Sequence, residues 1–160
     1  MPSRVDPEQF RNALGRFASG VTVITTRDVA GTDFGMTVSA FSSLSLEPPL
    51  VLFCIDHAAT IAPHVTAGGA VGVSVLAHGQ AALSRQFARK DADRFDGVSI
   101  IRAASGVALV ADAIVHLECQ VTALHDAGDH TIVVGAVTSI AAFPGEPLVY
   151  FRGAHGRLAP

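Results

Sequence analysis

The chain has 160 residues, enough for one domain with a sizeable core, and its composition (49% hydrophobic, 16% charged) predicts a folded protein rather than a disordered one. A net charge of −3 without a basic run argues against binding to nucleic acid or to an anionic membrane surface. No apolar stretch is long enough to cross a bilayer, and the first six residues lack the order of a signal peptide, so we expect a cytoplasmic protein.

The N-terminal half is expected to begin with a helix and continue as strands. Asp6-Pro7 is typical of a helix start, because the Asp side chain can cap free amides and proline fits the first turn. Phe10, Leu14 and Phe17 follow at helical spacing, and Gly20 ends the run. β-branched residues predict a strand over 21–26. Further strands are expected over 34–41, 50–55 and 71–76, with a short helix over 60–65.

The C-terminal half is dominated by two long apolar runs, 114–124 and 131–142, joined by the hairpin turn Asp126-Ala127-Gly128-Asp129. A short helix over 80–89, a charged loop over 91–96, and strands over 98–101, 107–110 and 148–151 complete the chain. Many short strands, few helices and no βαβ alternation predict a single domain over residues 1–160, an antiparallel barrel or sandwich.

Several common site motifs are absent from the sequence. There is no P-loop, no G-x-G-x-x-G between a strand and a helix, and no G-x-S-x-G. The histidine pairs His57/His64 and His125/His130 have no carboxylate or cysteine at matching spacing, so no metal site is expected. Cys54 and Cys119 each lie in an apolar run, which favours free buried thiols over a disulfide framework.

Four stretches carry residues that suggest chemistry. Thr37, Ser39, Ser42, Ser43 and Ser45 place small hydroxyls in an otherwise apolar segment, where they suit the polar edge of a flavin, a ribityl chain or a phosphate. On composition alone an exposed strand with solvated hydroxyls is favoured. In the segment 128–131, His130 either belongs to plain turn chemistry, which the spacing alone favours, or contacts a nicotinamide at the rim of a pocket.

The other two stretches also have two interpretations each, and for 84–90 the residues alone favour a core Phe87 and a solvated helix end. In 150–155, Arg152 either meets a phosphate or is a surface residue near the C-terminus. In 84–90, Phe87 either lines a ring or belongs to the core, and Arg89 and Lys90 either meet phosphates or form a solvated helix end.

Taken together, these stretches resemble the short-chain flavin reductases, which supply reduced flavin to a partner monooxygenase. The resemblance runs from about Phe10 to Leu158. It is carried in order by FASGVTV at 17–23, GMTVSAFSS at 35–43, PPLV at 48–51, GDH at 128–130 and PLVYF at 147–151.

The resemblance implies a mainly β fold, a split β-barrel of the Greek-key, FMN-binding type, usually a homodimer with the flavin near the subunit interface. Thr37, Val38 and Ser39 would face the isoalloxazine ring, and Met36 is included among the cofactor-binding residues. The rest of the implied site is as follows: Ser42, Ser43, Asp56, His57 and Thr60 along the ribityl chain and phosphate, Cys54 and Ile55 at the pocket border, Phe87, Ala88 and Arg89 on its far side, and His130, Arg152, Gly153 and His155 at the nicotinamide nucleotide.

The activity implied is an NAD(P)H:flavin oxidoreductase that transfers hydride to FMN or FAD, with a separate oxygenase component as partner. His130 is expected to orient the nicotinamide rather than to donate an obligatory proton. Two positions depart from the family pattern: Val38, where Ala is common, and His155, where many relatives carry Tyr. The rival readings are a reductase of another acceptor such as a corrinoid, a non-catalytic flavin-binding protein, and a structural barrel without a ligand. The sequence does not choose between FMN and FAD or between NADH and NADPH.

Overall fold

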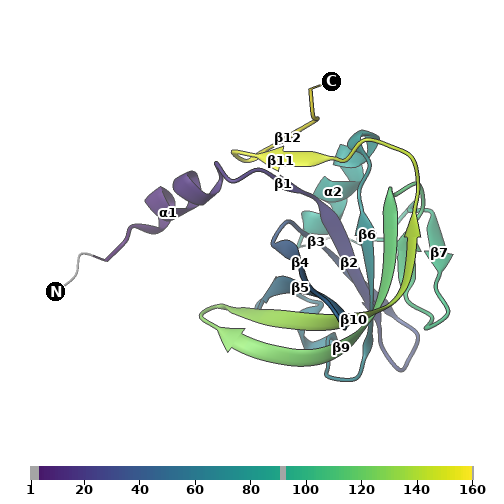
Figure 1. The fold of residues 1–160 in the computed structure, drawn as a ribbon. Coiled ribbons are helices and arrows are strands. Elements are labelled where there is room, and N and C mark those ends of the chain that lie inside the picture. Colours follow the sequence, from purple (N-terminus) through teal and green to yellow (C-terminus); the bar gives the residue numbers. More distant parts are fainter. Residues whose placement is uncertain (1–3, 91–92, 160) are drawn as a thin grey trace.

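The computed structural model describes residues 4–90 and 93–159 and is built around one seven-stranded antiparallel sheet (Figure 1). Its strand order is β3-β2-β6-β9-β10-β5-β4. The strands are β2 (Thr22–Arg27), β3 (Asp33–Val38), β4 (Phe41–Leu46), β5 (Pro49–Asp56), β6 (Ala70–Val75), β9 (Val115–Ala127) and β10 (His130–Ala142). The expected loop over 91–96 includes Asp91 and Ala92, which lie outside the described residues.

The sheet forms a split barrel. Its two edge strands, β3 and β4, are consecutive in the chain, and only Ser39 and Ala40 separate them. In the described part of the chain no ladder of hydrogen bonds joins these two strands, so the barrel stays open at this point. The expectation of a mainly β fold of the split-barrel type is confirmed.

Smaller elements surround the barrel (Figure 1). A three-stranded sheet contains β1 (Ser19–Gly20), β11 (Val149–Phe151) and β12 (Ala154–Gly156), and a hairpin contains β7 (Ile100–Arg102) and β8 (Ala108–Val110). The helical segments are α1 (Pro7–Leu14), η1 (Ala62–His64), η2 (His78–Gln80) and α2 (Ala81–Ala88). Helix α1 projects away from the barrel at the purple end of the chain, and none of its residues is buried. No helix in the described ranges is both long and apolar enough to span a bilayer.

Strand alternation sets which side chains enter the core. In β5, Val51, Phe53 and Ile55 point into the barrel and are buried, whereas Leu52 and Cys54 lie on the outer face and are half-buried. A second buried cluster, which includes Val21, Leu76, Phe87 and Leu148, packs outside the barrel under α2. The outer face of β5 is therefore free to form a site while its inner face holds the fold together.

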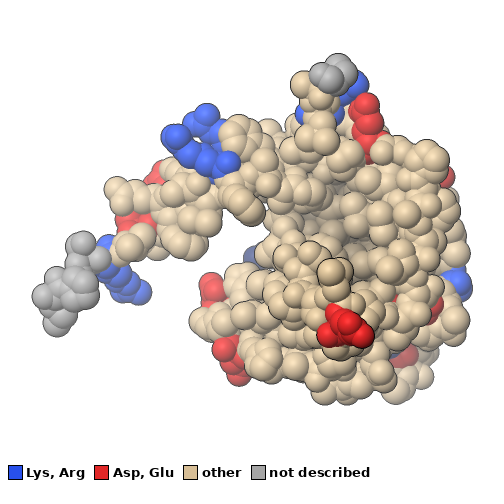
Figure 2. Space-filling model, in the orientation of Figure 1, with Lys and Arg blue, Asp and Glu red and all other residues tan. Residues whose placement is uncertain are grey.

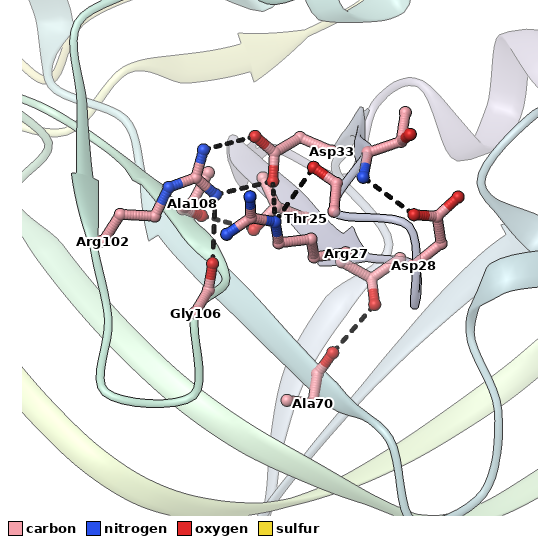
Figure 3. A network of polar contacts seen from close by, with 11 residues as sticks. Thr25, Arg27, Asp28, Asp33, Ala70, Arg102, Gly106 and Ala108 are labelled. Atoms are coloured by element: carbon pink, nitrogen blue, oxygen red, sulfur yellow. Dashed lines mark hydrogen bonds and ion pairs between the residues drawn. The ribbon is translucent and has the colours of Figure 1, made fainter.

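A network of polar contacts ties the β2–β3 hairpin to the β7–β8 hairpin (Figure 3). The Asp33 carboxylate accepts a hydrogen bond from Arg102 Nη1 at 2.6 Å, and Arg27 Nε lies 3.8 Å from Asp33 Oδ1. The hydrogen bond with Asp33 raises the pKa of the Arg102 guanidinium. Thr25 Oγ1 donates to the Ala108 carbonyl nearby. These contacts position the β7–β8 hairpin against the barrel, and their residues line none of the hollows described below.

Several expected elements differ from the structure. The helix expected to run to Gly20 ends at Leu14, and Ser19 and Gly20 form β1. The strand expected over 34–41 is two strands, because the chain breaks at Ser39-Ala40 before β4 pairs with β5. The helix expected over 60–65 is only the single turn η1. Strand β12 was not expected; it forms because Arg152 (φ +52°) and Gly153 (φ +78°) make a two-residue turn that reverses the chain.

Candidate functional site

The larger of two adjoining hollows, here called the first hollow, lies between the segment that contains α1 and the outer face of β4 and β5. Its volume is about 1080 Å³. Figure 2 shows an open cleft between the projecting N-terminal segment and the barrel, with walls that are mostly uncharged. The sequence-predicted residues that line it are Ser39, Ser42, Cys54, Arg152 and Gly153. Phe10, Leu14 and Phe17 contribute an apolar wall from the opposite side.

The second hollow lies between α2 and the β11–β12 hairpin and has a volume of about 600 Å³. Thr37, Ser39, Ser84, Arg85, Ala88 and His155 contribute to its lining. Ser39, Tyr150 and Gly153 line both hollows, so the two form one continuous depression. This size is within the range of small-molecule and cofactor sites, and the mixture of small apolar residues with a few hydroxyls suits flat aromatic ligands.

The break between β3 and β4 supplies backbone groups to this depression. Phe41 N donates to the Ser39 carbonyl at 2.9 Å, and Cys54 N donates to the Ala40 carbonyl at 3.1 Å. Within residues 4–90 and 93–159, no acceptor is found for the amide N–H groups of Ser39 and Ala40. Exposed amides of this kind can donate to a carbonyl, a ring nitrogen or a phosphate of a ligand.

Side-chain hydrogen bonds hold the walls of the second hollow in place. Thr37 Oγ1 donates to the Ser84 carbonyl at 2.6 Å, which ties β3 to α2. The Ser84 hydroxyl in turn lies 2.9 Å from His155 Nε2, which ties α2 to β12. Burial, and then the positive charge of Arg85, lowers the pKa of His155. Both effects favour the neutral imidazole.

Arg152 links the first hollow to the end of α1. Its backbone amide donates to the Gly15 carbonyl at 2.8 Å, and its guanidinium lies 5.9 Å from the centre of the Phe151 ring. The left-handed turn at Arg152 and Gly153 keeps this side chain at the edge of the first hollow. A cation at the edge can meet an anionic ligand without being buried.

The tip of the β9–β10 hairpin carries a second set of predicted residues. His130 Nδ1 lies 2.7 Å from Asp129 Oδ1, and His57 Nε2 lies 3.6 Å from Asp126 Oδ1. The hydrogen bond with His130 lowers the pKa of Asp129. His130 pairs with Asp56 in the β5–β10 ladder, and Ile132 pairs with Cys54. His130 thus lies on the same outer sheet face as Cys54, about 7 Å further along, and lines neither hollow.

The structure sorts the predicted residues into four groups. Thr37, Ser39, Ser42, Cys54, Ala88, Arg152, Gly153 and His155 line the joined hollows. Asp56, His57 and His130 gather near the hairpin tip. Met36, Val38, Ile55 and Phe87 pack in or against the core. Ser43, Thr60 and Arg89 line neither of the two hollows.

The resemblance implies that Ile55 borders the pocket, that Phe87 closes its far side and that Val38 faces the ring, but the side chains of all three are buried. Ile55 is an inward position of β5, and Phe87 is on the buried face of α2; both are at most 2% exposed. Val38 is likewise almost fully buried. Only the backbone of these residues is available to a ligand at the adjoining surface.

Sequence reasoning missed several residues of the depression. Tyr150 lines both hollows, Arg85 lines the second, and Phe10, Leu14 and Phe17 line the first. The apolar residues of the N-terminal helix were recognised only as a helical pattern, although a short amphipathic helix before a barrel has to cover some apolar surface. No group of three or more His, Cys, Asp or Glu that could hold a metal ion is found in the residues that the structure describes.

Comparisons of the chain with known proteins agree on one family. Residues 14–159 match the family described as "Flavin reductase like domain". The chain is 44% identical to an NADH-dependent flavin reductase of a Rhodococcus species, over 93% of this chain and 85% of the relative. It is 36% identical to the flavin-dependent monooxygenase reductase subunit HsaB of Rhodococcus jostii, over 98% of this chain and 80% of the relative.

A solved structure agrees in fold over nearly the whole chain. The NADH:FAD oxidoreductase SgcE6 of Streptomyces globisporus, in complex with NAD and FAD fragments, superposes with a TM-score of 0.91 at 39% identity, covering 99% of this chain and 98% of that one.

Proposed function

This chain belongs to the flavin reductase like domain family, and on that premise we propose that it transfers hydride from NADH to FMN or FAD and supplies reduced flavin to a partner monooxygenase. The observation that carries the proposal is the joined pair of hollows, lined by hydroxyls and free amides and large enough for two stacked rings. The same single domain, over residues 1–160, would serve both ligands.

The residues of the depression fit a flavin as substrate. The flavin accepts the hydride at N5 from the nicotinamide C4, so the bound rings themselves carry the chemistry. The chain's task is to hold the two rings in contact, which is mainly a proximity effect. In this proposal Thr37 and Ser39 meet the polar edge of the ring, and the amides of Ser39 and Ala40 stabilise the negative charge that develops there.

The charge distribution of the site supports release of the reduced flavin. The charged residues that line the first hollow are Arg11, Arg16 and Arg152, all outside β4 and β5. The β4–β5 wall itself is uncharged and includes Ser42, Leu52 and Cys54. A ring held against an uncharged wall gains no ion pair from that wall, which supports moderate rather than very tight flavin binding. Moderate binding suits a reductase whose product has to reach a separate oxygenase.

We further place the protein in the cytoplasm as a homodimer. Cys54 and Cys119 are both free thiols, which supports a reducing compartment. Phe10, Leu14 and Phe17 are exposed on the projecting N-terminal segment, and a second copy seated in the cleft beneath it would cover them and close the first hollow.

The proposed activity is tested by steady-state turnover of the purified protein with riboflavin, FMN or FAD and either NADH or NADPH. We expect rapid loss of the nicotinamide absorbance with excess flavin, and faster turnover with NADH. Flavin binding without nicotinamide oxidation would identify a flavin-binding protein instead. Slow reduction of free flavin, with fast reduction of another acceptor through bound flavin, would also contradict the proposal.

His130 is expected to act in nicotinamide binding. The His130 ring is held by Asp129 at the hairpin tip and lies on the same sheet face as Cys54. His130→Ala should therefore raise the KM for NADH by roughly tenfold, which corresponds to the loss of about one hydrogen bond. The kcat should change little. His125→Ala on the same hairpin is the matched control, since no hydrogen bond or ion pair of the His125 ring is found among the described residues. A collapse of kcat at saturating NADH would instead assign His130 to the chemical step.

A further inference from the structure

The second hollow contains two basic side chains and, within the described part of the chain, no carboxylate in its lining. The ionisable residues that face it are Arg85 from α2, His155 from β12 and Tyr150 from β11. Arg85 also lines a third hollow, of about 530 Å³, whose lining includes Asp93 and Asp96. The lining of the second hollow therefore carries one positive charge from Arg85, and a second one when His155 is protonated.

Arg85 is available for a ligand. It lies next to the buried Ser84 in α2, on an exposed position of the helix. Among the described residues, no carboxylate forms an ion pair with its guanidinium. A guanidinium at the wall of a concave site without an internal partner is well suited to bidentate contact with a phosphate.

His155 is held beside Arg85 by a fixed contact. Its Nε2 lies 2.9 Å from the hydroxyl of Ser84, the residue before Arg85, and its ring centre lies 5.7 Å from that of Tyr150. The positive charge of Arg85 disfavours protonation of His155, and an anion bound between the two side chains would favour it. The contact with Ser84 therefore holds the His155 ring near Arg85, where one anion can contact both side chains.

We propose that Arg85 and His155 together bind a phosphate group of a nucleotide ligand in the second hollow, and that His155 takes up a proton when this phosphate binds. The inference rests on the proposed function and deepens it, because it assigns the anionic part of a flavin or nicotinamide nucleotide to a place that neither the GDH segment nor Arg152 occupies. The phosphate can come from the flavin nucleotide or from the nicotinamide nucleotide, and the experiment separates these two sources.

The coupled proton makes phosphate binding depend on pH in a defined direction. In the free protein, burial and Arg85 lower the pKa of His155 from its ordinary value. A bound phosphate raises that pKa, because negative charge favours the imidazolium. At a pH below the pKa of His155 in the free protein, the imidazole is already protonated and the affinity for the phosphate does not change with pH. Above it, the apparent Kd rises with pH by up to about tenfold per unit, until the pKa of the bound state is passed.

The experiment pairs each ligand with an analogue that lacks phosphate. FMN is compared with riboflavin, and NADH is compared with N-benzyl-1,4-dihydronicotinamide, for the wild-type protein and the Arg85→Gln variant. We expect Arg85→Gln to raise the KM of one phosphate-bearing ligand about tenfold or more, and to leave its phosphate-free analogue unchanged. A selective effect on FMN assigns the flavin phosphate; a selective effect on NADH assigns the nicotinamide phosphates.

A second measurement tests His155. Between pH 5.5 and 8, the KM of the same phosphate-bearing ligand should rise with pH in the wild-type protein, and His155→Gln should flatten this rise. Arg157→Gln is the matched control, because Arg157 pairs with Glu146 at 3.5 Å and lines none of the three hollows. Equal effects of Arg85→Gln on ligands with and without phosphate would overturn the proposal, as would a pH profile unchanged by His155→Gln.

Failure of the proposed function can be told apart from failure of this inference. Turnover of riboflavin with N-benzyl-1,4-dihydronicotinamide by the wild-type protein tests the reductase activity without any phosphate. If that turnover is absent, quenching of FMN and riboflavin fluorescence by the wild-type protein and Arg85→Gln still measures binding. If Arg85→Gln no longer prefers FMN to riboflavin, the proposed flavin-phosphate site is supported even without reductase activity. If the preference for FMN is unchanged, Arg85 does not bind the flavin phosphate.

Discussion

Replacing Phe87 with alanine is expected to lower the free energy of unfolding by about 3–5 kcal/mol and also to weaken ligand binding in the second hollow. The Phe87 side chain is 0% exposed and packs edge-to-face on Phe95, with ring centres 5.0 Å apart. A Cβ built on Gly35 would come within 2.7 Å of the Phe87 ring, so this ring fixes the distance between α2 and β3. Its loss leaves a cavity beneath the helix that carries Ser84 and Arg85.

Urea denaturation measures the first effect and FMN titration, under conditions where the variant is folded, measures the second. Ile24→Ala is the matched control: Ile24 is fully buried in the barrel cluster and lines no hollow, so we expect about 2–5 kcal/mol of destabilisation with little change in FMN affinity. Phe87→Leu, which keeps most of the apolar volume, should restore FMN affinity. If Phe87→Leu binds FMN as weakly as Phe87→Ala, the aromatic ring contacts the flavin directly and the packing explanation is wrong.

The barrel strands were the most predictable part of the fold. Residues 21–26, 50–55 and 71–76 are rich in β-branched and apolar side chains, and the long β9–β10 hairpin is marked by its turn, where Gly128 adopts φ +69°. Strand β4 was harder to predict because its serines give no apolar alternation; it is a strand because it pairs with β5, with Phe41 opposite Phe53. Strand β12 depends on the turn at Arg152, a non-glycine residue with positive φ, which sequence patterns rarely reveal.

The site was predictable in its residue types but not in which way the side chains face. In β5, both Cys54 and Ile55 are apolar, so the sequence alone could not decide that Cys54 faces outward and Ile55 inward. For Phe87 the sequence offered a place in the core or contact with a ring, and the structure places it in the core. Arg85 was missed because its role depends on β12, which brings His155 beside it from 70 positions further along the chain.

The double substitution Phe10→Asp and Phe17→Asp is expected to separate the proposed dimer and to reduce flavin reductase activity by two orders of magnitude or more. Phe17 is 81% exposed and Phe10 is 57% exposed, yet both line the first hollow. Burying one such side chain contributes about 1.5–3 kcal/mol, so the four that a dimer buries contribute roughly 6–12 kcal/mol. A binding free energy in this range corresponds to dissociation constants from tens of micromolar to about one nanomolar. Two charges at these positions remove it.

Loss of activity follows from the dimer because the first hollow is open on the side where a second copy would sit. Sedimentation velocity measures the oligomeric state, and turnover is measured at the same protein concentrations. Val29→Asp is the matched control, since Val29 is fully exposed, lies in the loop between β2 and β3 and lines no hollow; it should stay dimeric and active. A double variant that is monomeric but fully active would mean that one chain holds both rings by itself. A double variant that remains dimeric would place the contact between copies on another face of the barrel.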